Sequence, residues 1–153
     1  MNLKQAGSAS EVDERLAALL TNANAVRAIT AAVEGTIGPK GLDTMLVDRF
    51  GEVIITNDGV TILDKMDVNH PAAKMLINIA KAQQAEVGDG TTTATIMAGG
   101  LVSEGVNQVL RGVPIARVIE GIKYGVAKAI EEIKVSGRQV TDINDPVLRK
   151  VAM

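Results

Sequence analysis

The sequence contains no cysteine and no tryptophan, and its only aromatic side chains are Phe50 and Tyr124. The absence of cysteine excludes a disulfide-stapled scaffold and a thiolate metal site, and it suits a reducing compartment such as the cytoplasm. Two rings offer no surface on which nucleic-acid bases could stack, and a net charge of −2 gives no basic patch for a phosphate backbone. We therefore expect no nucleic-acid partner.

Long apolar runs are also missing. The longest run, ATIMAGGLV, is far too short to cross a bilayer, and the N-terminal segment MNLKQAGSASEVDERL lacks the apolar stretch of a secretory signal. We expect a cytoplasmic protein with no membrane partner. Hydrophobic residues still make up 46% of the 153 residues. That share is typical of a folded domain, whose core here must consist of Ala, Val, Ile, Leu and Met.

Apolar spacing predicts a mainly α protein with one small hairpin. After the capping-box-like pair Ser10 and Asp13, apolar residues recur at helical spacing over about residues 11–34. The loop GTIGPKG then ends this helix. Two short β-like runs, TMLVD and EVIIT, follow and predict the hairpin.

More helices are predicted after the hairpin. VTILDKM predicts one or two helical turns, and longer helices are predicted at about residues 71–87, 91–110 and 115–133. Asp145 followed by Pro146 predicts an N-cap and the first residue of a last helix. This helix would stop after about two turns without a cap, so we expect the chain to be a fragment of a longer protein. Four methionines fall in apolar periodic segments and are expected in the core: Met45, Met66, Met75 and Met97.

The strongest local motif is GDGTTT, which consists of Gly88, Asp89, Gly90, Thr91, Thr92 and Thr93. A glycine-rich turn entering a helix offers free N–H groups and the positive end of the helix dipole to a phosphate, and the threonines add hydroxyl donors. Asp89 would repel a phosphate unless a divalent cation lay between them. Because Mg²⁺ binds through one or two carboxylates plus substrate phosphates, Asp89 is a candidate metal ligand. The alternative is that Asp89 only caps the helix and that the glycines only set the turn.

Two further loops have a structural and a functional interpretation. GTIGPKG lies at a helix C-terminus and by itself indicates a stop, although its backbone could also approach a nucleotide, with Lys40 nearby. NDG at residues 57–59 is an ordinary turn sequence, but Asp58 could instead orient or deprotonate the attacking water of a phosphoryl transfer. His70 has no partner ligand in the sequence and is expected to be structural.

Taken in order, TIGPKG, NDGVTIL, HPAAKM and EVGDGTTTAT resemble the chaperonins, which are ring-forming, ATP-driven folding machines. The similarity extends from about residue 13 to Met153 and favours the thermosome (group II) type or a thermosome-like bacterial chaperonin. It implies a helical bundle like a chaperonin equatorial domain, with one small β-hairpin. Residues 1–10 would be a flexible arm, 11–135 the N-terminal half of the ATP-binding equatorial domain, and 136–153 the start of a truncated intermediate domain.

The resemblance also implies ATP or ADP and Mg²⁺ as ligands. The family's phosphate loop falls on residues 88–93, its Mg²⁺ ligand on Asp89 and its water-activating aspartate on Asp58. Its second nucleotide loop falls on Thr36, Ile37, Gly38 and Pro39. The implied partners are unfolded proteins, bound through an apical domain that this sequence lacks, and the other subunits of a homo- or hetero-oligomeric double ring. The hairpin would pair with a neighbouring subunit.

Two other functions stay open at the level of sequence. The chain could be an inert structural or oligomerisation module that keeps the nucleotide loops, or an unrelated metabolite kinase whose glycine loops mimic the family. A kinase needs a small-molecule acceptor, a chaperonin needs only ATP and water, and an inert module shows neither activity.

Overall fold

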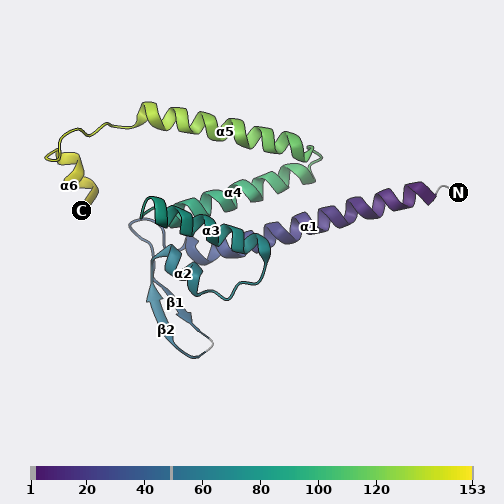
Figure 1. Ribbon diagram of the computed structural model, residues 1–153, viewed down its shortest axis with the longest axis horizontal. Helices are drawn as coiled ribbons and strands as arrows, with labels where there is room; N and C mark the ends of the chain where they lie inside the picture. The colour runs from purple at the N-terminus through teal and green to yellow at the C-terminus, as the bar shows by residue number, and fades with distance from the viewer. Residues whose placement is uncertain (1–2, 49, 153) are drawn as a thin grey trace. The chain divides into compact units, whose positions relative to one another are not determined.

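A computed structural model describes residues 3–48 and 50–152, and helices dominate this part of the chain. In order, the elements are α1 (Leu3–Glu34), β1 (Thr44–Val47), β2 (Val53–Thr56), α2 (Gly59–Lys65), α3 (Pro71–Glu86), α4 (Thr91–Leu110), α5 (Ile115–Ser136) and α6 (Pro146–Ala152). The predicted mainly α class with one small hairpin is confirmed (Figure 1). The chain divides into two compact units, residues 1–113 and 114–153.

The first helix begins earlier than its capping signal predicted. α1 starts at Leu3, so the start expected near Glu11 is wrong. The physical reason is that a lone glycine such as Gly7 weakens a helix by only about 1 kcal/mol and does not end it. The flexibility of residues 3–10 stays a prediction, and residues 1–2 of the expected arm lie outside the described residues.

Helices α1, α2 and α3 supply one continuous core in the first unit. The buried apolar side chains recur at helical spacing and are Val26, Ile29 and Val33 from α1, Ile62 and Leu63 from α2, and Ala73, Leu76, Ile77 and Ala80 from α3. Helix α4 packs against both α1 and α3, and the short α2 contacts all three of the long helices. This core therefore holds together the helices α1 and α3, after which the two glycine-rich loops begin.

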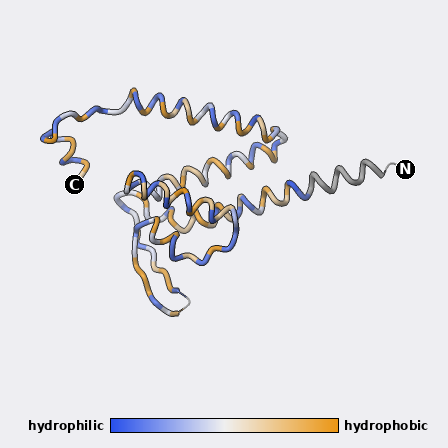
Figure 2. The backbone as a smooth tube through the Cα atoms, in the orientation of Figure 1, coloured by the Kyte–Doolittle hydropathy of each residue, from blue (hydrophilic) through white to orange (hydrophobic). Residues whose placement is uncertain are grey.

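The hairpin is antiparallel and projects from the helices of the first unit (Figure 1). Met45 pairs with Ile55 and Val47 with Val53, and all four side chains are more than half exposed. The strands therefore carry an uncovered apolar face. Figure 2 colours the hydrophobic residues along the hairpin orange. The core position expected for Met45 is wrong, because periodicity identifies a shared face but not what covers it.

In the described part of the second unit the chain forms the helices α5 and α6. Gly112, with φ of 93°, and Pro114 end α4 before α5 begins, as their residue types predicted. Asp145 accepts the Val147 N–H at 2.9 Å, which confirms its predicted N-cap role, and it also pairs with Arg138. The chain divides into its two units between residues 113 and 114. The expected division near residue 136 into equatorial and intermediate parts stays a prediction.

One stretch of the described chain, Glu14–Glu34 within α1, is long and apolar enough to cross a membrane by length and composition alone. Core helices of soluble proteins meet the same criterion. Four residues of this stretch are buried in the first unit, namely Ala23, Val26, Ile29 and Val33.

Candidate nucleotide site

The GDGTTT motif forms the loop between α3 and α4, and α4 begins at Thr91 as predicted. Gly88 and Gly90 have φ of 79° and 76°, a left-handed conformation that residues with a Cβ rarely adopt. Gly90 is the N-cap of α4, and no side chain caps this end. Asp89 is therefore not the cap; its Oδ1 instead accepts the N–H of Gly90 at 2.6 Å. The first-turn N–H groups of α4 consequently remain available to an anion.

The three threonines of the motif differ in exposure. Thr91 is buried, and its carbonyl accepts the hydroxyl of the buried Thr95 at 2.8 Å. Thr92 is partly buried and Thr93 is exposed. The first turn is thus anchored on its inner side, while the Thr93 side chain remains accessible to a ligand.

The NDG motif lies against the GDGTTT motif. Gly59 opens α2 and is buried, and a Cβ placed on it would collide with Oγ1 of Thr92 and come within 3.3 Å of the Thr92 Cα. Only glycine permits this approach. The structure therefore brings together two motifs, at residues 57–59 and 88–93, that are far apart in the sequence.

Asp58 caps α2. Its Oδ2 accepts the N–H and the hydroxyl of Thr61, the former at 3.0 Å, and its own N–H donates to the Thr56 hydroxyl. The side chain is exposed, and no partner of its Oδ1 is seen among the described residues. Asp58 is thus a cap with one carboxylate oxygen facing no protein donor, placed beside the start of α4 through Gly59.

The second glycine-rich loop ends α1 and folds tightly. The Thr36 hydroxyl donates to the Val33 carbonyl at 2.8 Å, and Gly38 has φ of 81°. A Cβ on Gly41 would collide with the carbonyl oxygen of Thr36, so the loop closes on its own backbone there. The predicted stop is confirmed, and Ile37, Gly38 and Pro39 are left exposed at the turn.

Helices α1 and α4 run antiparallel, and this determines where the loop after α1 lies relative to the GDGTTT loop before α4. Arg27 Nε donates to Ser103 Oγ at 3.1 Å, and one turn further along α1 the Thr30 side chain lies against Gly99. Advancing along α1 therefore means moving back along α4, towards its first turn. The end of α1, with Thr36, and the beginning of α4 consequently lie at the same end of the helix pair (Figure 1). No hydrogen bond joins these two loops among the described residues.

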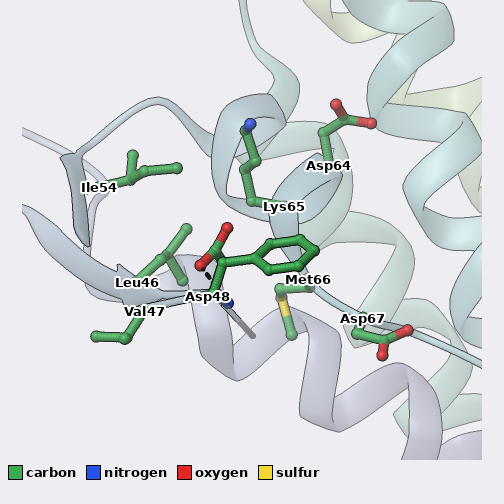
Figure 3. Close-up of a pocket in the computed structure, with 9 residues that line it drawn as sticks. Leu46, Val47, Asp48, Ile54, Asp64, Lys65, Met66 and Asp67 are labelled. Atoms are coloured by element: carbon green, nitrogen blue, oxygen red, sulfur yellow. Dashed lines mark hydrogen bonds between the residues drawn. The ribbon is translucent and has the colours of Figure 1, made fainter. Parts of the chain in front are cut away.

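A separate groove of about 540 Å³ lies between the hairpin and the end of α2 (Figure 3). Its apolar side includes Leu46, Ile54 and Met66, and its charged groups are Asp48, Asp64, Lys65 and Asp67. Three carboxylates against one ammonium repel a polyphosphate. None of the predicted nucleotide residues lines this groove, so it is not the candidate nucleotide site.

The described residues contain no cluster of three or more His, Cys, Asp or Glu side chains that could hold a metal ion by itself. A cation at Asp89 would therefore need additional oxygen ligands, which nucleotide phosphates and water supply for Mg²⁺. His70 is structural, as predicted: its Nδ1 accepts the Ala72 N–H at 3.2 Å and caps α3.

An exposed ion pair joins α2 to α3. Lys81 Nζ lies 2.5 Å from Asp64 Oδ1, and its hydrogen bond and positive charge lower the pKa of the Asp64 carboxyl. Both side chains are about half exposed, so solvent screens the pair and its contribution to stability is small.

Sequence reasoning missed Gln83. In the last turn of α3, its Nε2 donates to the carbonyl oxygen of Asp89 at 2.9 Å and so crosses the base of the GDG loop. The only signal in the sequence for this contact was an amide side chain one turn before a glycine-rich loop. Helical spacing alone predicts that such a side chain is exposed to solvent.

Comparison with known proteins identifies the family of the chain. The model of the TCP-1/cpn60 chaperonin family matches residues 29–153. The chain is 47% identical over 131 residues to the thermosome subunit beta of Archaeoglobus fulgidus and 46% identical over 132 residues to the thermosome subunit of Methanocaldococcus jannaschii. Each alignment covers 86% of this chain and 24% of the relative, so the chain spans about a quarter of their length.

A solved chaperonin structure has the same fold as this chain. The crystal structure of a group III chaperonin in the open state superposes with a TM-score of 0.82 at 56% identity, over 88% of this chain and 27% of that one. Because the family model matches most of the chain and the fold matches a solved chaperonin at high identity, the chain belongs to the TCP-1/cpn60 chaperonin family.

Proposed function

We propose that this chain forms the ATP-binding equatorial part of a ring-forming chaperonin subunit. The single observation that carries the proposal is the close packing of Gly59 against Thr92, which places Asp58 beside the uncapped first turn of α4. A phosphate-binding helix end, a carboxylate suited to Mg²⁺ and a carboxylate suited to a water molecule then lie within one small region.

The residues fit the phosphates and the metal through different groups. Backbone N–H groups of residues 91–93 and the exposed Thr93 hydroxyl would hold the phosphates, and Asp89 would hold Mg²⁺ through its carboxylate. Bound Mg²⁺ would neutralise phosphate charge during hydrolysis. The loop of Thr36, Ile37, Gly38 and Pro39 would approach the nucleotide from the end of α1.

Asp58 would act on the attacking water. Because its Oδ2 is already used by Thr61, the other oxygen, Oδ1, is the acceptor that would orient the water or take its proton. The hydrogen bonds from Thr61 fix the Asp58 carboxylate in place. The structural role of NDG, as the cap of α2, and its functional role, as an acceptor for the water, are therefore compatible in one side chain.

The whole protein would couple Mg²⁺-dependent ATP hydrolysis to the folding of unfolded proteins in the cytoplasm. Relatives named thermosome subunits and a chaperonin support this part of the proposal. Unfolded substrates would bind through an apical domain beyond this sequence. The uncovered apolar face of the hairpin, with Met45 and Ile55 at its centre, would be buried against another subunit of a double ring.

Calorimetric titration with ADP, with Mg²⁺ and with a chelator, tests the nucleotide site. We expect binding with Mg²⁺ and much weaker binding without it, because Asp89 repels an unbridged phosphate. Asp89→Asn should reduce the difference between the two conditions, whereas Asp67→Asn, an exposed aspartate in the groove under the hairpin, should leave it unchanged. Equal affinity in the two conditions would contradict the metal role of Asp89. No binding in either condition would instead favour an inert oligomerisation module.

A further inference from the structure

We propose that Gln83 is a positioning residue that sets the direction of the Asp89 carboxylate, and hence the strength of Mg²⁺ binding. This inference rests on the proposed nucleotide site and adds to it a residue that lies outside both glycine-rich motifs. It depends on a chain of two hydrogen bonds through one peptide group.

The peptide group between Asp89 and Gly90 is held at both ends. Its carbonyl oxygen, which belongs to Asp89, accepts Nε2 of Gln83 at 2.9 Å. Its N–H, which belongs to Gly90, donates to Asp89 Oδ1 at 2.6 Å. In a planar trans peptide the C=O and N–H point in opposite directions. Fixing the carbonyl towards α3 therefore fixes the N–H, and with it the bonded carboxylate, on the opposite side.

Without Gln83 this peptide group would have unusual freedom. Gly90 forms one side of this peptide group, and Gly88 precedes Asp89 on the other. Both glycines occupy the left-handed region. Glycine populates positive and negative φ about equally, so rotation of the peptide plane meets little steric resistance at Gly90. A carboxylate that follows such a rotation could not bind a cation that demands near-ideal octahedral geometry at short distances.

Gln83 is itself well anchored. It lies in the last turn of α3, where its backbone carbonyl accepts the N–H of Val87 at 2.9 Å. Its side chain is partly buried, and its Nε2 lies 3.4 Å from the position that a Cβ on Gly90 would occupy. The next residue, Gln84, shares the helix and the side-chain chemistry but makes no side-chain hydrogen bond among the described residues. Gln84 is therefore a matched control.

The test compares Gln83→Met with Gln84→Met in the assembled protein. Methionine keeps the length of the side chain and removes the donor. We measure the Mg²⁺ concentration that gives half-maximal ADP binding, and we follow Mn²⁺ in place of Mg²⁺ by electron paramagnetic resonance. For Gln83→Met we expect the half-saturating metal concentration to rise about 2- to 12-fold, the range for loss of one neutral hydrogen bond. ADP affinity at saturating metal should be nearly restored.

A merely structural role would instead lower the melting temperature and ADP affinity at every metal concentration. That result, or an unchanged half-saturating concentration in a folded Gln83→Met variant, would overturn the proposal. Gln83→Asn keeps the amide but is one methylene too short to reach Asp89, so it decides the matter if the methionine variant does not fold. If the unmodified protein binds ADP without regard to Mg²⁺, the proposed metal site fails and this inference fails with it. If ADP binding by the unmodified protein depends on Mg²⁺ but the Gln83 variant has the same half-saturating metal concentration, the role of Gln83 is refuted and the proposed metal site is not.

Discussion

Two adjacent glycines of α4 allow a sharp test of how this helix packs against α1. A Cβ on Gly99 would collide with Thr30 Oγ1 and lie 3.1–3.2 Å from its Cβ and Cγ2, whereas a Cβ on Gly100 would meet nothing within 4 Å. Thr30 cannot turn away freely, because its hydroxyl donates to the Val26 carbonyl and its β-branched side chain is stiff at χ1. The same substitution, Gly→Ala, should therefore have opposite effects at neighbouring positions.

The expected magnitudes follow from two terms. Alanine in place of a helical glycine stabilises by about 0.8–1 kcal/mol, and this is the whole effect expected for Gly100→Ala. Overpacking costs about 1–3 kcal/mol, so Gly99→Ala should destabilise by up to about 2 kcal/mol net. In a chain of this size each kcal/mol shifts the melting temperature by about 2–4 °C. Urea denaturation and thermal melting of both variants measure the difference.

A double-substitution cycle supplies the control. Thr30→Ala removes Oγ1 and Cγ2, so Gly99→Ala should cost less in that background, and the two substitutions should be coupled. Gly99→Ala should also weaken Mg²⁺-dependent ADP binding, because it shifts the end of α1 relative to the first turn of α4. If Gly99→Ala stabilises as much as Gly100→Ala, the close approach of α1 and α4 is refuted.

Three more predictions concern charges and the hairpin. In the assembled protein, Asp89→Ala should weaken Mg·ATP binding and abolish turnover, whereas Asp58→Ala should leave affinity nearly intact and lower single-turnover hydrolysis by about 10²–10⁴-fold; parental hydrolysis by the second variant would make Asp58 only a cap. Met45→Lys should reduce self-association in sedimentation experiments, and unchanged oligomers would show that the apolar hairpin face is not an interface. Lys81→Met should raise the pKa of Asp64 in an NMR titration. Because the pKa of Asp64 is lowered in the folded state, the small stabilisation by the ion pair exists above the ordinary pKa of 3.8 and disappears as the pH falls through the folded pKa. A loss of stability in Lys81→Met that does not depend on pH would contradict this assignment.

The elements that the sequence predicted well are those with strong local signals at both ends. Helix α4 begins and ends as predicted because Gly90 precedes it and Gly112 and Pro114 follow it, and none of these residues continues a helix easily. The start of α1 was missed because capping residues inside a helix are indistinguishable in sequence from those at its end. Ser10 and Asp13 fit a cap, but nothing before them except Gly7 resists helix formation.

Burial was harder to predict than secondary structure. Of the four methionines expected in the core, Met66 packs against it, while Met45, Met75 and Met97 are 61–69% exposed. Their apolar spacing shows only that they share a face with other apolar residues. Whether another element covers that face depends on tertiary contacts that single-sequence patterns do not contain.

For the candidate site, each loop was visible in the sequence but their proximity was not. No local pattern shows that Gly59 packs against Thr92, and only the family resemblance grouped the two motifs in advance. Gln83 could not be identified because its hydrogen bond to Asp89 depends on the path of the loop backbone. Polar residues in the last turn of a helix are usually solvated, so their identity alone indicates no such contact.

A crystal structure of the protein with Mg²⁺ and ADP tests the central claim most directly. We expect the metal about 2.0–2.1 Å from an Asp89 carboxylate oxygen and the phosphates on the N–H groups of residues 91–93. We also expect Gln83 to remain hydrogen-bonded to the Asp89 carbonyl. A metal held without Asp89, or a nucleotide bound away from the first turn of α4, would contradict the proposed site.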